Sequence, residues 1–334
     1  MKNKYQLVVV AAVLMLVLSI MPRSTEAATI QKKVSVDVLN MRSGPSTGYS
    51  VIYQLKKGQI VNVAQEQNGW SKITYGSRTG WVASQYLSHI TWKGYVSASA
   101  LNLRKSASTT STIIATLPKG TFVNVEQQGI GWLKVYVPSK GLRGWVSSSY
   151  ITKVRIKGKV IVLDPGHGGV DGGASGSTHL EKELNLRTVK ELAILFRQAG
   201  ATVILTREDD RYLSLQERVD VSEKYNADAF ISIHYNSAGS TASGVMSFYY
   251  DSSKDQELAK YIQEGMVKET GMKDMGVRYG NFYVLRENSR PSVLLELGFL
   301  SNPTEEKKIA TITYQRNVSR GIFIGVNKYF SVYK

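Results

Sequence analysis

The stretch that decides the fold of the carboxyl-terminal half is Lys159-Val160-Ile161-Val162-Leu163-Asp164-Pro165-Gly166-His167-Gly168-Gly169. Its first five residues are mostly β-branched and aliphatic, which is typical of a strand buried on both faces. The strand passes directly into a turn whose glycines let the backbone bend tightly around an imidazole. The segment therefore predicts a buried strand that presents His167 at its carboxyl end.

Three similar apolar runs follow, and helical patterns separate them. The further predicted strands are Thr202–Leu205, 229–233 and 292–295. After the first strand, apolar residues recur every three or four positions from Leu186, and Gly200 provides a helix stop. Strands that alternate with helices predict an α/β domain with a mainly parallel sheet over residues 159–334.

Two later helices carry start signals in the sequence. Ser214 with Glu217, and Ser253 with Gln256, each form the spacing of a capping box. Both patterns precede apolar residues at helical spacing. They predict helix starts at these two serines.

Polar side chains follow three of the predicted strands at the point where each strand ends. His167 follows the first, His234 follows the 229–233 strand, and Glu296 follows the 292–295 strand. Ligands bind beyond the carboxyl ends of the strands in such sheets, so we expect these side chains at one edge. Glu181 lies 14 residues after His167, in the loop that enters the next helix, and can fold back over that edge.

Two imidazoles and a carboxylate with one open position are the ligand set of a catalytic Zn²⁺ site. Such an ion lowers the pKa of its water towards ~7 and polarises the carbonyl under attack. A second carboxylate must then move the water's proton, and Glu296 is the candidate because it is not needed as a ligand. Spacing alone leaves His179 open as an alternative to Glu181. The residues thus predict a zinc hydrolase.

Nearby polar residues have structural interpretations as well. Arg207 and Asp210 are expected to form a structural ion pair rather than contact a substrate. Asn236, two residues after His234, can orient either a substrate or its own loop.

The amino-terminal half contains an internal repeat. Leu39-Asn40-Met41-Arg42 recurs as Leu101-Asn102-Leu103-Arg104, at an offset of 62 residues. Further matches at offsets of 62 and 64 residues include Gly58, Val61, Trp70, Gly80, Trp81 and Tyr86 with Gly120, Val123, Trp132, Gly144, Trp145 and Tyr150. Alternating apolar residues between turns predict small β-barrels.

These two units resemble bacterial SH3-type (SH3b) domains, over residues 32–88 and 94–152. The resemblance implies two small all-β SH3-like barrels that bind the cell wall. The four tryptophans of the repeats could line a peptide groove or belong to the barrel core and rim. A short basic linker, residues 152–158, precedes the α/β domain.

The amino terminus and the charge indicate where the protein acts. Two lysines, an apolar run and small residues predict a signal peptide over residues 1–27, and hence secretion without stable membrane insertion after cleavage. The chain has no cysteine, so it has no disulfide framework. The first 155 residues carry 19 Lys and Arg against 4 Asp and Glu. In this compartment the basic half favours anionic cell-wall polymers as partners over nucleic acid.

The α/β half closely resembles the zinc-dependent N-acetylmuramoyl-L-alanine amidases. The shared stretches are residues 164–169, 181–186, 205–207, 232–236 and 295–302. The resemblance implies that His167, Glu181 and His234 hold Zn²⁺ and that Glu296 is catalytic, which favours Glu181 over His179. It also implies that the substrate is peptidoglycan and that the amide between the N-acetylmuramoyl lactyl group and L-alanine is hydrolysed.

Two other functions remain open at this stage. A zinc peptidoglycan peptidase would use the same metal on a different amide. A non-catalytic cell-wall-binding protein would need the repeats but not the four site residues.

Overall fold

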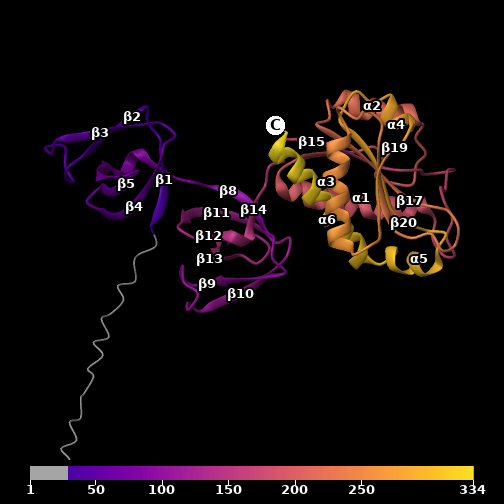
Figure 1. The fold of residues 1–334 in the computed structure, drawn as a ribbon, viewed down its shortest axis with the longest axis horizontal. Helices are drawn as coiled ribbons and strands as arrows, with labels where there is room; N and C mark the ends of the chain where they lie inside the picture. Colours follow the sequence, from indigo (N-terminus) through magenta and orange to yellow (C-terminus); the bar gives the residue numbers. More distant parts are fainter. Residues whose placement is uncertain (1–28, 334) are drawn as a thin grey trace, which may run out of the picture. The chain divides into compact units, whose positions relative to one another are not determined.

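The computed structural model describes residues 29–333. The predicted signal peptide, residues 1–27, lies outside the described residues. Within them, no helix is both long enough and apolar enough to span a membrane. The chain divides between Leu87 and Ser88 into two compact units (Figure 1).

The first unit is the first copy of the repeat. Its elements are β1 (Ile30–Val34), β2 (Val38–Arg42), β3 (Val51–Lys56), β4 (Ile60–Gln67), β5 (Trp70–Tyr75), β6 (Arg78–Ala83) and the 3₁₀ turn η1 (Ser84–Tyr86), with β7 (Leu87–His89) at the boundary. The strands pair antiparallel in the order β3-β2-β6-β5-β4-β1. Alternate side chains such as Leu39, Met41 and Val61 point into one small core, as the sequence alternation predicts.

The second copy opens the second unit and repeats the same strand order. Its elements are β8 (Trp92–Val96), β9 (Ala100–Arg104), β10 (Ile113–Pro118), β11 (Phe122–Gly129), β12 (Trp132–Val137), β13 (Leu142–Ser147), η2 (Ser148–Tyr150) and β14 (Ile151–Lys153). They pair antiparallel in the order β10-β9-β13-β12-β11-β8. The two copies therefore fold alike, each around its own core.

The repeated motifs have a structural cause. A Cβ atom at Gly80 would lie 2.8 Å from the carbonyl oxygen of Arg42, and one at Gly144 would lie 2.8 Å from that of Arg104. Both arginines also donate hydrogen bonds to carbonyls of the loop that follows. The motif residues thus hold two crossing strands and one loop together. The four repeat tryptophans are only half-buried and belong to neither core.

The rest of the second unit is an α/β domain around a six-stranded sheet. Its strands are β15 (Val160–Pro165), β16 (Thr202–Leu205), β17 (Ala229–Asn236), β18 (Val245–Tyr249), β19 (Asp274–Tyr279) and β20 (Ser292–Phe299). The spatial order is β16-β15-β17-β20-β18-β19. The helices are α1 (Glu181–Ala199), α2 (Leu215–Lys224), α3 (Gln256–Thr270), α4 (Tyr283–Arg286), α5 (Pro303–Ile309) and α6 (Ile312–Val332).

The sheet is mixed rather than the mainly parallel sheet expected from the sequence. β16, β15, β17 and β20 pair parallel, whereas β18 pairs antiparallel with β20 and parallel with β19. A parallel partner requires a crossover of about a dozen residues or more, usually a helix. The connection from β17 to β18 is too short for that, so the chain turns back on itself.

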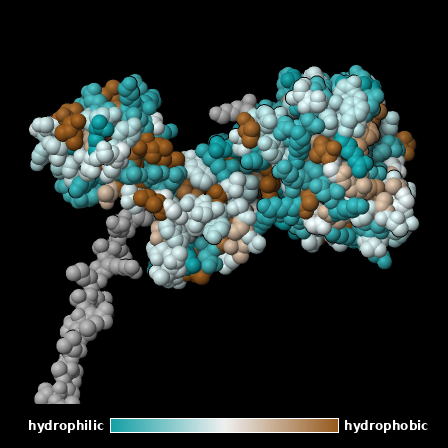
Figure 2. Space-filling view, in the orientation of Figure 1, coloured by the Kyte–Doolittle hydropathy of each residue, from teal (hydrophilic) through white to brown (hydrophobic). Residues whose placement is uncertain are grey.

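Helices cover both faces of this sheet (Figure 1) and pack on it through apolar side chains. On one face α1, α3 and α6 pack on the strands around residues such as Ile231, Phe196 and Ile322. On the other face α2 and α4 cover a smaller cluster that includes Phe230 and Leu285. On the face of the α/β domain visible in Figure 2, apolar side chains are scattered among hydrophilic ones.

The capping and stop signals found in the sequence are confirmed in all but one case. Gly200 and Gly271 end α1 and α3 in the left-handed conformation, and Ser214 forms the predicted capping box with Glu217. The box expected at Ser253 is wrong, because α3 begins after Asp255. The buried Asp255 carboxylate accepts instead from the backbone N–H groups of Asp251 and Ser292, which fixes the start of α3 through a neighbouring strand.

Candidate metal centre and active site

The site lies at the carboxyl edge of the three central strands, β15, β17 and β20. Their register aligns Pro165 with Ile233 and His234 with Glu296. The two residues after Pro165 therefore bring His167 to the same edge. His234 and Glu296 lie within their strands rather than after them, because both strands continue further than the sequence pattern predicted.

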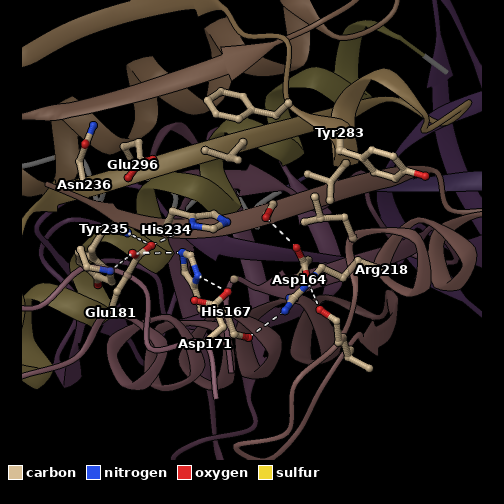
Figure 3. A pocket seen from close by; sticks show the side chains of 18 of the residues that line it. Asp164, His167, Asp171, Glu181, Arg218, His234, Tyr235, Asn236, Tyr283 and Glu296 are labelled. Carbon is tan, nitrogen blue, oxygen red and sulfur yellow. Dashed lines mark hydrogen bonds and ion pairs between the residues drawn. The ribbon is translucent and has the colours of Figure 1, made fainter. Parts of the chain in front are cut away.

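Three side chains with metal-binding atoms converge at this edge (Figure 3). One donor atom from each of His167, Glu181 and His234 lies within 4.8 Å of the others. Nδ1 of His234 is 2.8 Å from Glu181 Oε1, and Nε2 of His167 is 3.2 Å from Glu181 Oε2. Two imidazole rings thus contact one carboxylate, and all three groups carry atoms that can bind a metal ion.

Glu181 is the first residue of α1, not a loop residue as expected. Its carboxylate accepts from the backbone N–H groups of Ala174 (2.8 Å) and Tyr235 (3.1 Å). Burial alone would raise its pKa, but hydrogen bonds from His167 and His234 hold the pKa of this carboxyl well below its usual range. The first turn of a helix also stabilises a negative charge. Glu181 is therefore an ionised, oriented carboxylate.

The turn that carries His167 has an uncommon backbone. His167 has a φ of 59°, in the left-handed region that few non-glycine residues adopt. Nδ1 of its ring is 2.8 Å from Asp171 Oδ2, so Nε2 faces Glu181. A Cβ atom at Gly166 would lie 2.2 Å from the His234 ring, so only glycine leaves room for both imidazoles.

Two buried arginines hold this turn in place. Arg218 donates to Asp164 (2.7 Å), to the Pro165 carbonyl and to the His167 carbonyl. Arg207 donates to carbonyls of the same turn, including that of Gly166. Burial alone would raise the pKa of Asp164, but the charge of Arg218 with hydrogen bonds from two hydroxyls lowers it. This role of Arg218 was not predicted, because a charged residue on a helix usually faces solvent.

Removing the Asp164 charge should destabilise the α/β domain. We expect Asp164→Asn to lower the free energy of unfolding by about 3 kcal/mol, because Arg218 would stay buried without its counter-charge. Denaturant unfolding of both proteins measures the difference. Asp209→Asn, at an exposed carboxylate, should change the same quantity by less than about 0.5 kcal/mol. Equal stability of Asp164→Asn and the parent would show that the pair contributes nothing.

Glu296 lies beside the cluster but outside the group of three. Its side chain lines the pocket, and its Oε2 atom is buried without a hydrogen-bond partner among the described residues. Burial raises the pKa of Glu296 to about 7. A carboxyl group with such a pKa can both accept and release a proton near neutral pH.

Two other expectations from the sequence have clear outcomes. His179 does not approach the cluster: its Nδ1 lies 3.3 Å from Glu306, which also accepts from backbone N–H groups of the same loop. The expected ion pair between Arg207 and Asp210 is absent, because Arg207 binds carbonyls and Asp210 accepts from Lys182. Asn236 lines the pocket, and its side chain accepts from the backbone of Ser237.

The cluster opens into a cavity of about 560 Å³. Part of its lining is apolar or aromatic and comes from the segment before α2, the first residue of α2 and the segment around α4. These residues are Tyr212, Leu213, Leu215, Phe282, Tyr283 and Val284. Sequence reasoning missed this wall. The sequence feature that could have indicated this wall is a set of apolar residues outside the predicted strands. Several of these residues are exposed.

Comparisons with known proteins support the two resemblances found in the sequence. The profile of the family described as N-acetylmuramoyl-L-alanine amidase matches residues 161–328. The bacterial SH3 domain profile matches residues 37–88 and 99–152.

Curated relatives match most of the chain. The putative N-acetylmuramoyl-L-alanine amidase YrvJ of Bacillus subtilis is 37% identical over 89% of this chain, which spans 64% of YrvJ. The probable cell wall amidase LytH of Staphylococcus epidermidis is 32% identical, and the match covers 87% of this chain and 81% of LytH.

Solved structures match the α/β half. The catalytic domain of CwlV, an N-acetylmuramoyl-L-alanine amidase from Bacillus (Paenibacillus) polymyxa, is 40% identical with a TM-score of 0.51 and covers 52% of this chain and 99% of its own. The N-acetylmuramoyl-L-alanine amidase of Clostridium difficile 630 is 37% identical with a TM-score of 0.52, covering 53% and 100%. Because the profile and these relatives agree, the chain belongs to the N-acetylmuramoyl-L-alanine amidase family, with two bacterial SH3 domains ahead of the amidase domain.

Proposed function

We propose that this protein hydrolyses the amide between the lactyl group of N-acetylmuramic acid and L-alanine in peptidoglycan, with Zn²⁺ held by His167, Glu181 and His234 and with Glu296 as the proton carrier. The observation that carries the proposal is the cluster of three donors beside Glu296, whose buried Oε2 atom has no hydrogen-bond partner within the described part of the chain. Family membership supports the reaction and the bond.

The residues present fit a zinc ion. Two imidazoles and one carboxylate are a ligand set of catalytic zinc sites, in which a fourth position stays open. The ionised Glu181 attracts a cation, and Asp171 orients His167 as outer carboxylates orient metal-binding imidazoles. A zinc ion bound there would polarise the amide carbonyl and lower the pKa of a water molecule.

Glu296 is suited to carry the proton in this reaction. Its buried Oε2 has no competing hydrogen bond among the described residues, so it is free to accept from the attacking water. The resulting carboxylic acid then donates the proton to the leaving nitrogen of L-alanine, which departs as an amine. The apolar wall around Phe282 and Leu215 would contact the methyl groups of the stem peptide.

Product analysis tests the proposed bond. Peptidoglycan digested by the zinc-loaded protein should release stem peptides that begin with a free L-alanine amine, which mass spectrometry identifies. Peptides cut within the stem would instead indicate a zinc peptidase. Intact peptidoglycan would indicate a wall-binding protein without catalysis.

The contact between Asp171 and His167 should matter for metal affinity. We expect Asp171→Ala to weaken zinc binding about 10- to 100-fold, because such a carboxylate fixes the tautomer and direction of the ligand ring. Competition with a chromogenic chelator measures the affinity. Asp171→Asn keeps an acceptor oxygen and should lose less. Parent-like affinity of Asp171→Ala would contradict this role.

The setting of the enzyme follows from its other domains. We propose that the protein is secreted, acts in the cell wall and is retained there by its SH3-type domains. The strongly basic amino-terminal half favours attraction to anionic wall polymers as well as to peptidoglycan itself.

A further inference from the structure

The second SH3-type domain packs directly against the amidase domain. Tyr95 of β8 and Phe122 of β11 contact Phe323 of α6, with ring centroids 5.2 and 5.5 Å apart. Phe323 also packs on Phe196 of α1, at 5.9 Å. Tyr95 and Phe323 are 4% and 2% exposed, so this contact is part of a packed hydrophobic core.

Polar groups reinforce the same contact. Glu269 of α3 is buried and pairs with both Lys119 and Arg320, and the Arg320 bond is 2.7 Å long. Asn327 of α6 accepts from the backbone N–H of Arg155 (2.7 Å) and donates to the carbonyl of Lys153 (3.1 Å). The expected linker is therefore part of the structure, and Val154 and Ile156 within it are buried in the amidase core.

This packing creates a second cleft, of about 520 Å³, between the second SH3-type domain and helices α3 and α6. Five cationic side chains line it. They are Lys119, Lys153, Arg155, Lys268 and Lys328. The two acidic residues in the lining are Glu264 and Glu269, and Glu269 is already occupied by Lys119 and Arg320.

Four of these cations have no acidic partner among residues 29–333: Lys153, Arg155, Lys268 and Lys328. All four are exposed at the cleft. Against these four cations the lining holds one exposed carboxylate outside the ion pairs described above, that of Glu264, so the cleft keeps an excess of positive charge. Such an excess around a concave surface raises the local concentration of an oppositely charged ligand. Several such charges in one cleft suit a chain that carries repeated anionic groups better than a single small ion.

The other residues that line the cleft indicate which kind of anionic polymer it fits. Ser97, Thr152 and Ser331 supply hydroxyl groups, and Tyr261 supplies a phenolic ring. Ile324 is the one aliphatic side chain in the lining. In a polyol chain linked by phosphodiesters, the hydroxyl groups can form hydrogen bonds with the hydroxyl side chains of the cleft, and the phosphates can pair with its cations. The planar guanidinium of Arg155 also matches the geometry of a phosphate.

We propose that the cleft between the second SH3-type domain and helices α3 and α6 binds a phosphodiester-linked polyol polymer of the cell wall. The site is separate from the amide-hydrolysing centre, so binding can be measured without turnover. The amidase domain and its neighbouring SH3-type domain form this site together, because each contributes part of the cationic rim.

Binding of soluble poly(glycerol phosphate) to the full chain at low ionic strength tests the proposal. The test variant is Lys268→Glu with Lys328→Glu, which reverses two charges in the cleft. The matched control is Lys224→Glu with Lys190→Glu, at exposed lysines outside the lining. Lys268 and Lys224 both lie in last helical turns, and both variants change the net charge equally.

We expect the cleft variant to weaken binding about tenfold or more and the control to change it less than about threefold, with the difference shrinking as salt is added. Equal weakening by both variants would show diffuse attraction and overturn the proposal, as would parent-like binding by the cleft variant. Equal loss of binding to poly-L-glutamate would overturn the phosphate assignment. Activity on soluble muropeptides verifies folding, and Lys268→Gln with Lys328→Gln replaces a variant that fails to fold.

Discussion

Replacing Glu296 by glutamine should lower the rate of peptidoglycan hydrolysis by about 10²- to 10⁴-fold, the range that a general acid–base group contributes. Glutamine has nearly the same shape but cannot accept the proton of water or deliver it to the leaving nitrogen. Release of stem peptides from purified peptidoglycan, followed over time, measures the rate.

Zinc content separates this role from that of a ligand. Because Glu296 lies outside the group of three donors, Glu296→Gln should keep one zinc ion per chain and the unfolding temperature of the parent. Loss of the metal together with activity would make Glu296 a ligand. Activity near that of the parent would remove it from catalysis.

Replacing His234 by alanine should abolish both zinc retention and activity. Only His167 and Glu181 would remain of the three converging donors, and an open site with two protein ligands holds zinc poorly. Metal analysis after dialysis against a weak chelator measures retention, and the digestion assay measures activity.

His179 offers a matched control for this experiment. Its ring is directed to Glu306 and not to the cluster, so His179→Ala should retain zinc and most of its activity. Full zinc occupancy in His234→Ala, or loss of zinc in His179→Ala, would mean that His179 completes the site in place of one of the three.

The location of the candidate site could be predicted because it depends on topology alone. The carboxyl ends of adjacent parallel strands share an edge whatever their exact lengths, so His167, His234 and Glu296 were expected together. Strand ends were less predictable. β17 and β20 continue past 233 and 295 because their next residues still pair in the sheet.

The features that sequence reasoning missed depend on contacts between distant segments. The antiparallel direction of β18 was not predicted, although the connection from β17 to β18, residues 237–244, is too short to hold a crossover helix. The pairing of Asp164 with Arg218, 54 residues apart, was not predicted either, because the helix pattern gives no sign that Arg218 is buried. One feature of the sequence was consistent with the packing of the second SH3-type domain on the amidase domain. Val154 and Ile156 alternate with basic residues in the expected linker.

Locating the metal tests the central claim most directly. Anomalous diffraction at the zinc absorption edge, from crystals of the zinc-loaded protein, shows where the ion lies without relying on activity. We predict one strong peak in contact with His167, Glu181 and His234, with Glu296 close by but not bonded to it. A peak beside His179 and Glu306, or none at the carboxyl edge of β15 and β17, would contradict this account.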